Sequence, residues 1–151
     1  MIERYSRKEL TIIWEDFNKY SIWLEIELAA AEAMEKLKII PRGVVKKVKS
    51  KAKINIKRIS DIEDKVKHDV IAFLTSIAEK SGKEARYLHK GMTSSDVLDT
   101  CFNLQLKQSG EILLKDLDLL LGSIKKEALR HKESRKHNRT RYRRFQSQIF
   151  D

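Results

Sequence analysis

Apolar side chains recur at helical spacing along three stretches of the chain. In the stretch from Thr11 to Leu37, the apolar positions are Ile13, Phe17, Tyr20, Leu24, Leu28 and Ala31. Because these positions fall on one face of a helix, the whole stretch is predicted to be helical, and Ala29, Ala30 and Ala33 would permit close contact with another helix. Pro41 cannot continue a helix and ends the segment.

The second stretch has the clearest pattern, i, i+3, i+4, i+7, i+8, at Val70, Phe73, Leu74, Ile77 and Ala78. Gly82 is placed to cap the C-terminus of this helix. The third stretch runs to about Arg130 with a predicted break near Gly110, and its apolar positions are Val97, Cys101, Leu104, Ile112, Leu113, Leu117, Leu120, Leu121, Ile124 and Ala128.

Two polar signals predict where helices begin. Ser6 and Glu9 have the spacing of a capping box, so a helix is expected just after Tyr5 and the first four or five residues are expected to form an arm. The run Gly91-Met92-Thr93-Ser94-Ser95-Asp96 reads as a loop that ends in an Asp or Ser N-cap.

The fold class predicted from these patterns is all-α. The chain has one Pro and five Gly, which leaves few sharp turns, and the sequence has no internal repeat and no convincing strand. We expect an N-terminal helical domain over residues 1–110, the start of a long helix over 111–134, and a basic tail over 135–151.

Composition narrows the class of protein further. Hydrophobic residues make up 41% and charged residues 36%, and no stretch approaches the roughly 18 to 20 apolar residues of a bilayer span. The N-terminus MIERYSRKEL lacks a signal-peptide pattern, so a cytoplasmic protein without membrane association is expected. A single cysteine, Cys101, excludes an internal disulfide and a metal site built from several thiolates.

The net charge of +10 is unevenly distributed. Residues 135–151 carry six basic residues and one acid, whereas residues 1–134 carry 26 basic and 21 acidic residues. A second basic run comprises Lys46, Lys47, Lys49, Lys51, Lys53, Lys57 and Arg58. A solvated helix face is the favoured interpretation because no aromatic residues are interleaved, while a helical module that binds nucleic acid or an acidic partner stays as an alternative.

Three polar groups lie at predicted helix boundaries: Arg4-Tyr5, Lys67-His68-Asp69, and Thr93-Ser94. Individually they suit a solvated arm, a helix cap at Asp69 and a capping turn. Together they also suit an anionic ligand, because arginine, hydroxyl groups and helix N-termini bind phosphate and carboxylate. A histidine in such a place can carry a proton near pH 7.

The strings MIERYSR, KHDVIAF and GMTSSDVLDT, in this order and at these intervals, resemble the N-terminal part of the adenylosuccinate lyase family, within the fumarase and aspartase superfamily. The resemblance covers about residues 1–134. It implies an all-α homotetramer with a central helical bundle and active sites that each combine three subunits. It also implies release of fumarate from adenylosuccinate and from the related succinyl-carboxamide intermediate of purine synthesis, without metal or organic cofactor.

The resemblance further implies roles for individual residues. Arg4 and Tyr5 would contact the nucleotide, and Lys67, His68 and Asp69 match a site where the histidine lies beside the substrate and supports catalysis or phosphate binding. Thr93 and Ser94 would hold a succinyl carboxylate. His89 resembles a phosphate-side histidine, and a surface histidine is an equal alternative.

The two proton carriers of the family are missing by this comparison. Arg141 stands where the general-acid histidine of a G-R-[ST]-H-G motif would fall, and the serine base would lie beyond Asp151. For the basic tail we expect a frameshift near Ser134 or Arg135, with a genuine, functional basic extension as the alternative. The chain alone is expected to be an inactive N-terminal fragment, with an interaction subunit of an intact lyase as a further alternative.

Overall fold

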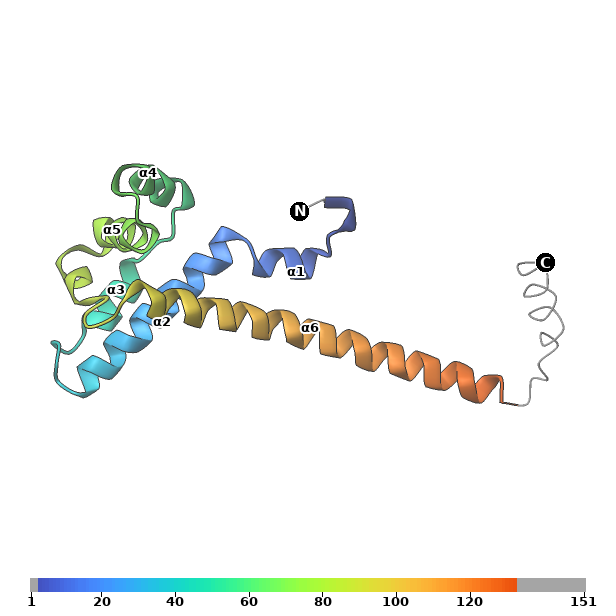
Figure 1. Cartoon of the computed structure of the whole chain (residues 1–151). Helices are drawn as coiled ribbons and strands as arrows, with labels where there is room; N and C mark the ends of the chain where they lie inside the picture. Colours follow the sequence, from blue (N-terminus) through green and yellow to red (C-terminus); the bar gives the residue numbers. More distant parts are fainter. Residues whose placement is uncertain (1–2, 133–151) are drawn as a thin grey trace. The chain divides into compact units, whose positions relative to one another are not determined.

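The computed structural model describes residues 3–132, and every regular element within that range is helical (Figure 1). The all-α prediction is therefore confirmed. The elements in chain order are η1 (Glu3–Tyr5), α1 (Lys8–Ile13), α2 (Asp16–Lys36), α3 (Val44–Lys51), α4 (Ile56–Val66), α5 (Asp69–Ser81), η2 (Gly82–Tyr87) and α6 (Ser94–Arg130). The chain divides into two compact units, residues 1–112 and 113–151.

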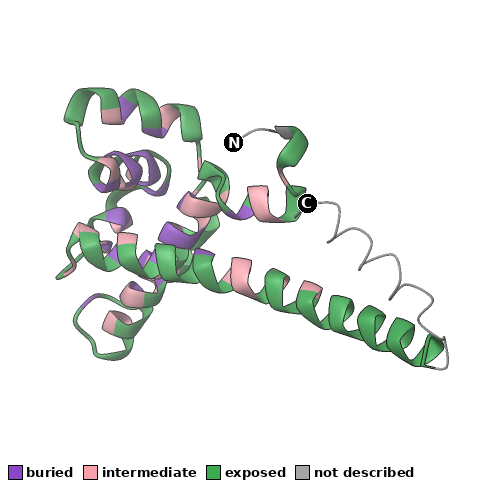
Figure 2. Ribbon diagram, turned by 45° about the vertical axis from the view of Figure 1, so that its right-hand side comes forward, coloured by how far each residue is buried: buried purple, intermediate pink, exposed green. Residues whose placement is uncertain are grey.

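The core of the first unit is built around three aromatic rings. Phe73 of α5 stacks on Tyr20 of α2 with ring centroids 5.8 Å apart, and Trp23 meets Phe73 edge to face at 5.5 Å. Ile59 of α4 and Val97 of α6 are buried in the same cluster. Figure 2 shows buried positions in purple along the helices. Val44 and Val48 of α3 belong to this cluster as well, so five helices contribute to one core, which fixes the helix ends that carry the candidate site.

The beginning of the chain differs from the prediction. Residues Glu3–Tyr5 form a 3₁₀ turn, and α1 begins at Lys8 with Arg7 as its N-cap residue. The expected single helix from Thr11 to Leu37 is wrong, because the chain leaves the helical path at Trp14 and Glu15 before α2 begins. Phe17, which belongs to the predicted apolar face, is consequently 58% exposed.

The break between α1 and α2 is stabilised by side-chain amides. Asn18 Nδ2 donates to the Ile13 carbonyl at 2.8 Å, and Gln105 Nε2 of α6 donates to the same carbonyl at 2.7 Å. A carbonyl at a helix end has no partner within its helix, and these amides supply one. The break is thus stabilised in part by Gln105, which lies near the C-terminal end of the first unit in the chain.

Helices α4 and α5 pack as a hairpin. The Asn55 side chain caps α4 by accepting from the Arg58 N–H at 3.0 Å, and Lys67 ends it with a left-handed φ of +53°. The prediction for α5 is confirmed, including its cap at Gly82, whose φ is +74°. The sequence analysis does not predict α4, because its few apolar positions lie in a strongly charged segment.

Helix α6 continues from Ser94 to Arg130 without interruption, so the predicted break near Gly110 is wrong. A glycine inside a helix costs about 1 kcal/mol but removes no backbone hydrogen bond, and the helix tolerates it. The last buried residue of α6 is Gln105. From Leu113 to Lys132 every residue except Asp116 is exposed. No helix within residues 3–132 combines the length and apolar composition of a membrane span.

Candidate functional site

Lys67, His68 and Asp69 form the turn between α4 and α5. His68 is the N-cap residue of α5, and its Nδ1 accepts from the Ile71 N–H at 3.4 Å. The predicted cap at Asp69 is thus wrong: Asp69 is the first helical residue, and its Oδ1 accepts from the Val70 N–H at 2.7 Å. Both side chains remain close to half exposed. The turn therefore presents an imidazole and a carboxylate at a helix N-terminus, accessible to a ligand.

Thr93 and Ser94 form the start of α6. The Thr93 hydroxyl accepts from the Ser95 N–H at 3.2 Å, and Asp96 Oδ2 accepts from the Thr93 N–H at 2.8 Å, in the reciprocal pattern of a capping box. The N-cap is thus Thr93 and not the expected Asp or Ser. Since the Thr93 hydroxyl accepts in this bond, its hydrogen stays available, and within the described residues the Ser94 hydroxyl makes no hydrogen bond.

His89 lies in the turn before α6 and is held by a buried carboxylate. Its backbone N–H donates to Glu27 Oε2 at 2.6 Å, and its ring Nδ1 lies 2.6 Å from Glu27 Oε1. The Glu27 side chain is 0% exposed and the His89 side chain 21%. His89 is therefore partly buried and paired with Glu27 rather than freely solvated.

Sequence reasoning missed Glu27, although a signal for it existed. Trp23, Glu27 and Ala31 have i, i+4, i+8 spacing, which places the carboxylate on the same buried face of α2 as an aromatic ring and a small residue. A buried carboxylate needs hydrogen-bonding partners. The spacing alone predicts that Glu27 has such a partner. It does not predict that the partner is His89, which lies 62 residues further along the chain.

Arg4 and Tyr5 lie in the exposed η1 turn. The Arg4 guanidinium carbon is 4.7 Å from the centroid of the Tyr5 ring, and the two side chains are exposed. The pair offers a cation and an aromatic face together, which suits a planar anionic ligand.

No hydrogen bond or ion pair within residues 3–132 joins any of these groups to another. Each group consists of neighbouring residues in the chain, and all the groups belong to the first unit. Within residues 3–132, no group of three or more histidine, cysteine, aspartate or glutamate side chains is arranged to hold a metal ion.

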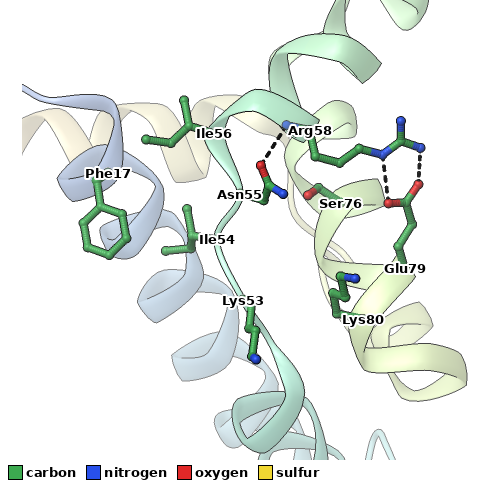
Figure 3. Close-up of a pocket in the computed structure, with 9 residues that line it drawn as sticks. All are labelled: Phe17, Lys53, Ile54, Asn55, Ile56, Arg58, Ser76, Glu79 and Lys80. Atoms are coloured by element: carbon green, nitrogen blue, oxygen red, sulfur yellow. Dashed lines mark hydrogen bonds and ion pairs between the residues drawn. The ribbon is translucent and has the colours of Figure 1, made fainter.

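A cavity of about 370 Å³ lies elsewhere on the first unit, between Phe17, the residues before α4 and the end of α5 (Figure 3). Arg58 binds Glu79 beside it through two hydrogen bonds of 2.9 and 2.5 Å, which lower the pKa of the Glu79 carboxyl. This cavity is at the start of α4 and the end of α5, whereas the Lys67-His68-Asp69 turn is at the opposite end of that hairpin. None of the predicted site residues lines it.

The basic run is partly neutralised by neighbouring acids. Lys47 of α3 pairs with Glu84 of η2 at 3.0 Å, and this hydrogen bond lowers the pKa of Glu84. Arg58 pairs with Glu79 as described above. These pairs support the interpretation of the run as a solvated helix face. The basic tail at 135–151 lies outside the described residues.

A family model described as lyase matches residues 7–146 of the chain. The chain belongs to the lyase family. The match includes residues 135–146 of the basic tail.

This lyase-family chain is 46% identical over 132 residues to an adenylosuccinate lyase of Bacillus subtilis (strain 168), covering 87% of the chain and 31% of the relative. It is 43% identical over 143 residues to an adenylosuccinate lyase of Aquifex aeolicus (strain VF5), covering 93% and 33%. The predicted resemblance is thereby confirmed. The chain spans about a third of the length of these relatives.

Among solved structures, a fumarate lyase from Mesorhizobium sp. BNC1 matches with a TM-score of 0.61 and 24% identity, over 68% of this chain and 26% of that chain. At this level of identity, the match supports only the fold of the lyase-family chain.

Proposed function

We propose that the chain is the substrate-binding, N-terminal portion of an adenylosuccinate lyase, an enzyme that releases fumarate from adenylosuccinate and from the related succinyl-carboxamide intermediate of purine synthesis. The observation that carries this proposal is the similarity to two adenylosuccinate lyases at 46% and 43% identity. The exposed, ligand-accessible groups at the starts of α5 and α6 support it.

The groups suit the parts of such a substrate. The Ser94 hydroxyl suits a succinyl carboxylate, with the Thr93 hydroxyl hydrogen beside it. Arg4 and Tyr5 suit the nucleotide base and its charge. His68, with Lys67 and Asp69 on either side in the chain, suits a supporting role next to the reacting bond, and His89 suits the phosphate.

The proposal extends to assembly and location. We propose a cytoplasmic homotetramer in which these groups, which make no bonds to one another within the described residues, complete sites with residues of neighbouring subunits. No cofactor is required by this elimination, which needs a base for the carbon-bound proton, an acid for the leaving nitrogen and stabilisation of the doubly charged intermediate.

Binding of adenylosuccinate to the purified chain tests the proposal, with isothermal titration calorimetry as the measurement. Ser94→Ala removes a hydroxyl that makes no hydrogen bond in the described structure, so it should weaken binding about tenfold without loss of stability. Ser95→Ala is the matched control and should leave binding unchanged. Absence of binding by the wild-type chain, or equal losses in both variants, would contradict the proposed function.

The chain alone is expected to release no measurable fumarate. Loss of a general acid alone typically costs about 10² to 10⁴ in rate, and Arg141 occupies the position at which the resemblance places that acid. The absorbance change of adenylosuccinate cleavage is the measurement, and turnover by the purified 151-residue chain would refute this expectation.

A further inference from the structure

We infer that Glu27 is a positioning residue that fixes the His89 ring so that its Nε2 atom is presented to an anion such as phosphate. The inference deepens the proposed function, on which it rests, by adding a residue from α2 to the site. It depends on the geometry of two side chains from distant parts of the chain.

The Glu27 carboxylate is engaged only by His89 among the described residues. Oε2 accepts from the backbone N–H and Oε1 faces the ring Nδ1, each at 2.6 Å. A fully buried carboxylate is unfavourable unless it is hydrogen-bonded and paired. Among the described residues, His89 therefore supplies both hydrogen bonds that compensate for burial of the Glu27 carboxylate. The carboxylate in turn fixes the backbone and the ring of His89.

The backbone of His89 has a left-handed conformation, with φ at +57°. Histidine is among the non-glycine residues enriched in this conformation. Two hydrogen bonds to one buried acid hold the backbone and the ring of His89 in this conformation.

The geometry also decides which ring nitrogen is available. An ionised carboxylate only accepts hydrogen bonds, so Nδ1 carries a hydrogen directed at Glu27. Nε2 is then the remaining ring nitrogen for a ligand, and the doubly protonated ring can donate to Glu27 and to an anion at once. The side chain is 21% exposed, which leaves the ring accessible in part.

The position of His89 links it to the hydroxyl turn. The Met92 N–H donates to the His89 carbonyl at 3.4 Å, and Thr93 follows directly. Fixing His89 therefore also fixes the chain that leads into α6. His89 is only four residues before Thr93 in the chain, so the groups assigned to the phosphate and to a carboxylate of one substrate belong to the same short segment.

Nuclear magnetic resonance of the ¹⁵N-labelled full chain tests the inference, with inorganic phosphate as the probe. In the wild-type chain, the His89 ring should show a hydrogen on Nδ1, and added phosphate should shift its Nε2 resonance. A bare Nδ1, or no response of His89 to phosphate, would overturn the inference, and neither result depends on a variant folding.

Glu27→Gln is the decisive variant, since an amide has one accepting oxygen and cannot serve both His89 donors. We expect the His89 ring to lose its single tautomer and the phosphate affinity to fall about tenfold or more. Glu32→Gln, on the exposed side of the same helix where Glu32 pairs with Lys36, is the matched control and should change neither. An unchanged His89 ring and phosphate affinity in Glu27→Gln would overturn the inference.

The outcomes separate this inference from the proposed function. If phosphate acts on His89 in a manner that depends on Glu27 while adenylosuccinate does not bind, the positioning role stands and the proposed function fails. If adenylosuccinate binds equally well to the wild-type and Glu27→Gln chains, with the same His89 ring spectrum, the proposed function stands and the positioning role fails.

Discussion

Gln105 donates a hydrogen bond of 2.7 Å from its side-chain amide to the carbonyl of Ile13, 92 residues earlier in the chain. Both residues are buried. The bond connects α6 to the end of α1, the helix that follows Arg4 and Tyr5 in the chain. The long helix thereby helps to determine where the N-terminal segment changes direction.

Gln105→Leu should destabilise the first unit by about 1–3 kcal/mol, because a buried donor is lost and one partner of the Ile13 carbonyl disappears. Urea unfolding followed by tryptophan fluorescence measures the change. Gln108→Leu, the same substitution one turn later, is the control: Gln108 only accepts from Asn18 at 3.2 Å in a partly buried place. Equal effects of the two substitutions would contradict the role assigned to Gln105.

Phe73→Ala should cost about 3–5 kcal/mol of unfolding free energy, since it leaves a cavity between Tyr20 and Trp23. Phe102→Ala removes the same side chain from a position that is 52% exposed. Its effect should stay below about 1 kcal/mol. The denaturant midpoints of both variants are compared with that of the wild type. An effect of Phe102→Ala as large as that of Phe73→Ala would contradict the assignment of Phe73, rather than Phe102, to the core.

The pair of Arg58 and Glu79 should contribute stability that depends on pH. The hydrogen bond from Arg58 lowers the pKa of Glu79 below its ordinary 4.5. The contribution is therefore present above pH 4.5 and is lost as the pH falls through the lower pKa of the folded state. Glu79→Gln should be slightly less stable than wild type at neutral pH, and the two should converge in acid. A difference that persists in acid would contradict this origin.

The exposed leucines of α6 should cause self-association. Leu117, Leu120 and Leu121 are each more than half exposed, as are most apolar residues between positions 113 and 129. We expect them to form an apolar patch larger than the few hundred Å² usual for a monomer. Sedimentation should show concentration-dependent association that is reduced by replacing these three residues with Gln, while Lys125→Gln with Lys126→Gln should preserve it. A monodisperse wild-type monomer at high concentration would refute the prediction.

The sequence predicts elements whose signals are local. The spacing of Val70, Phe73 and Ile77 predicts α5, and Gly82 predicts its C-terminal end. Gly82 has a positive φ, which glycine adopts more readily than other residues, so this signal is local. The hydroxyl turn before α6 is likewise predicted, although its cap is Thr93.

Features that depend on distant contacts are not predictable in this way. The break after Ile13 is stabilised by the Gln105 amide of α6. The spacing of apolar residues over Thr11–Leu37 does not reveal this partner, because it lies far along the chain. The carboxylate of Glu27 is detectable as an unusual residue on an apolar face, but its bond to His89 is visible only in the folded chain. Motif resemblance located the candidate residues, while the structure supplies the bonds that hold them.

Helix α6 changes character along its length, since it is anchored up to Gln105 and exposed from Leu113 onward apart from Asp116. Its 37 residues span about 55 Å. An isolated helical stretch of this kind is marginal in water, because it depends on its own backbone bonds. Amide hydrogen exchange should consequently form a gradient within one continuous helix, slow around Val97 and Cys101 and fast beyond Leu113, so that local opening starts at the C-terminal part and leaves the anchored turns intact.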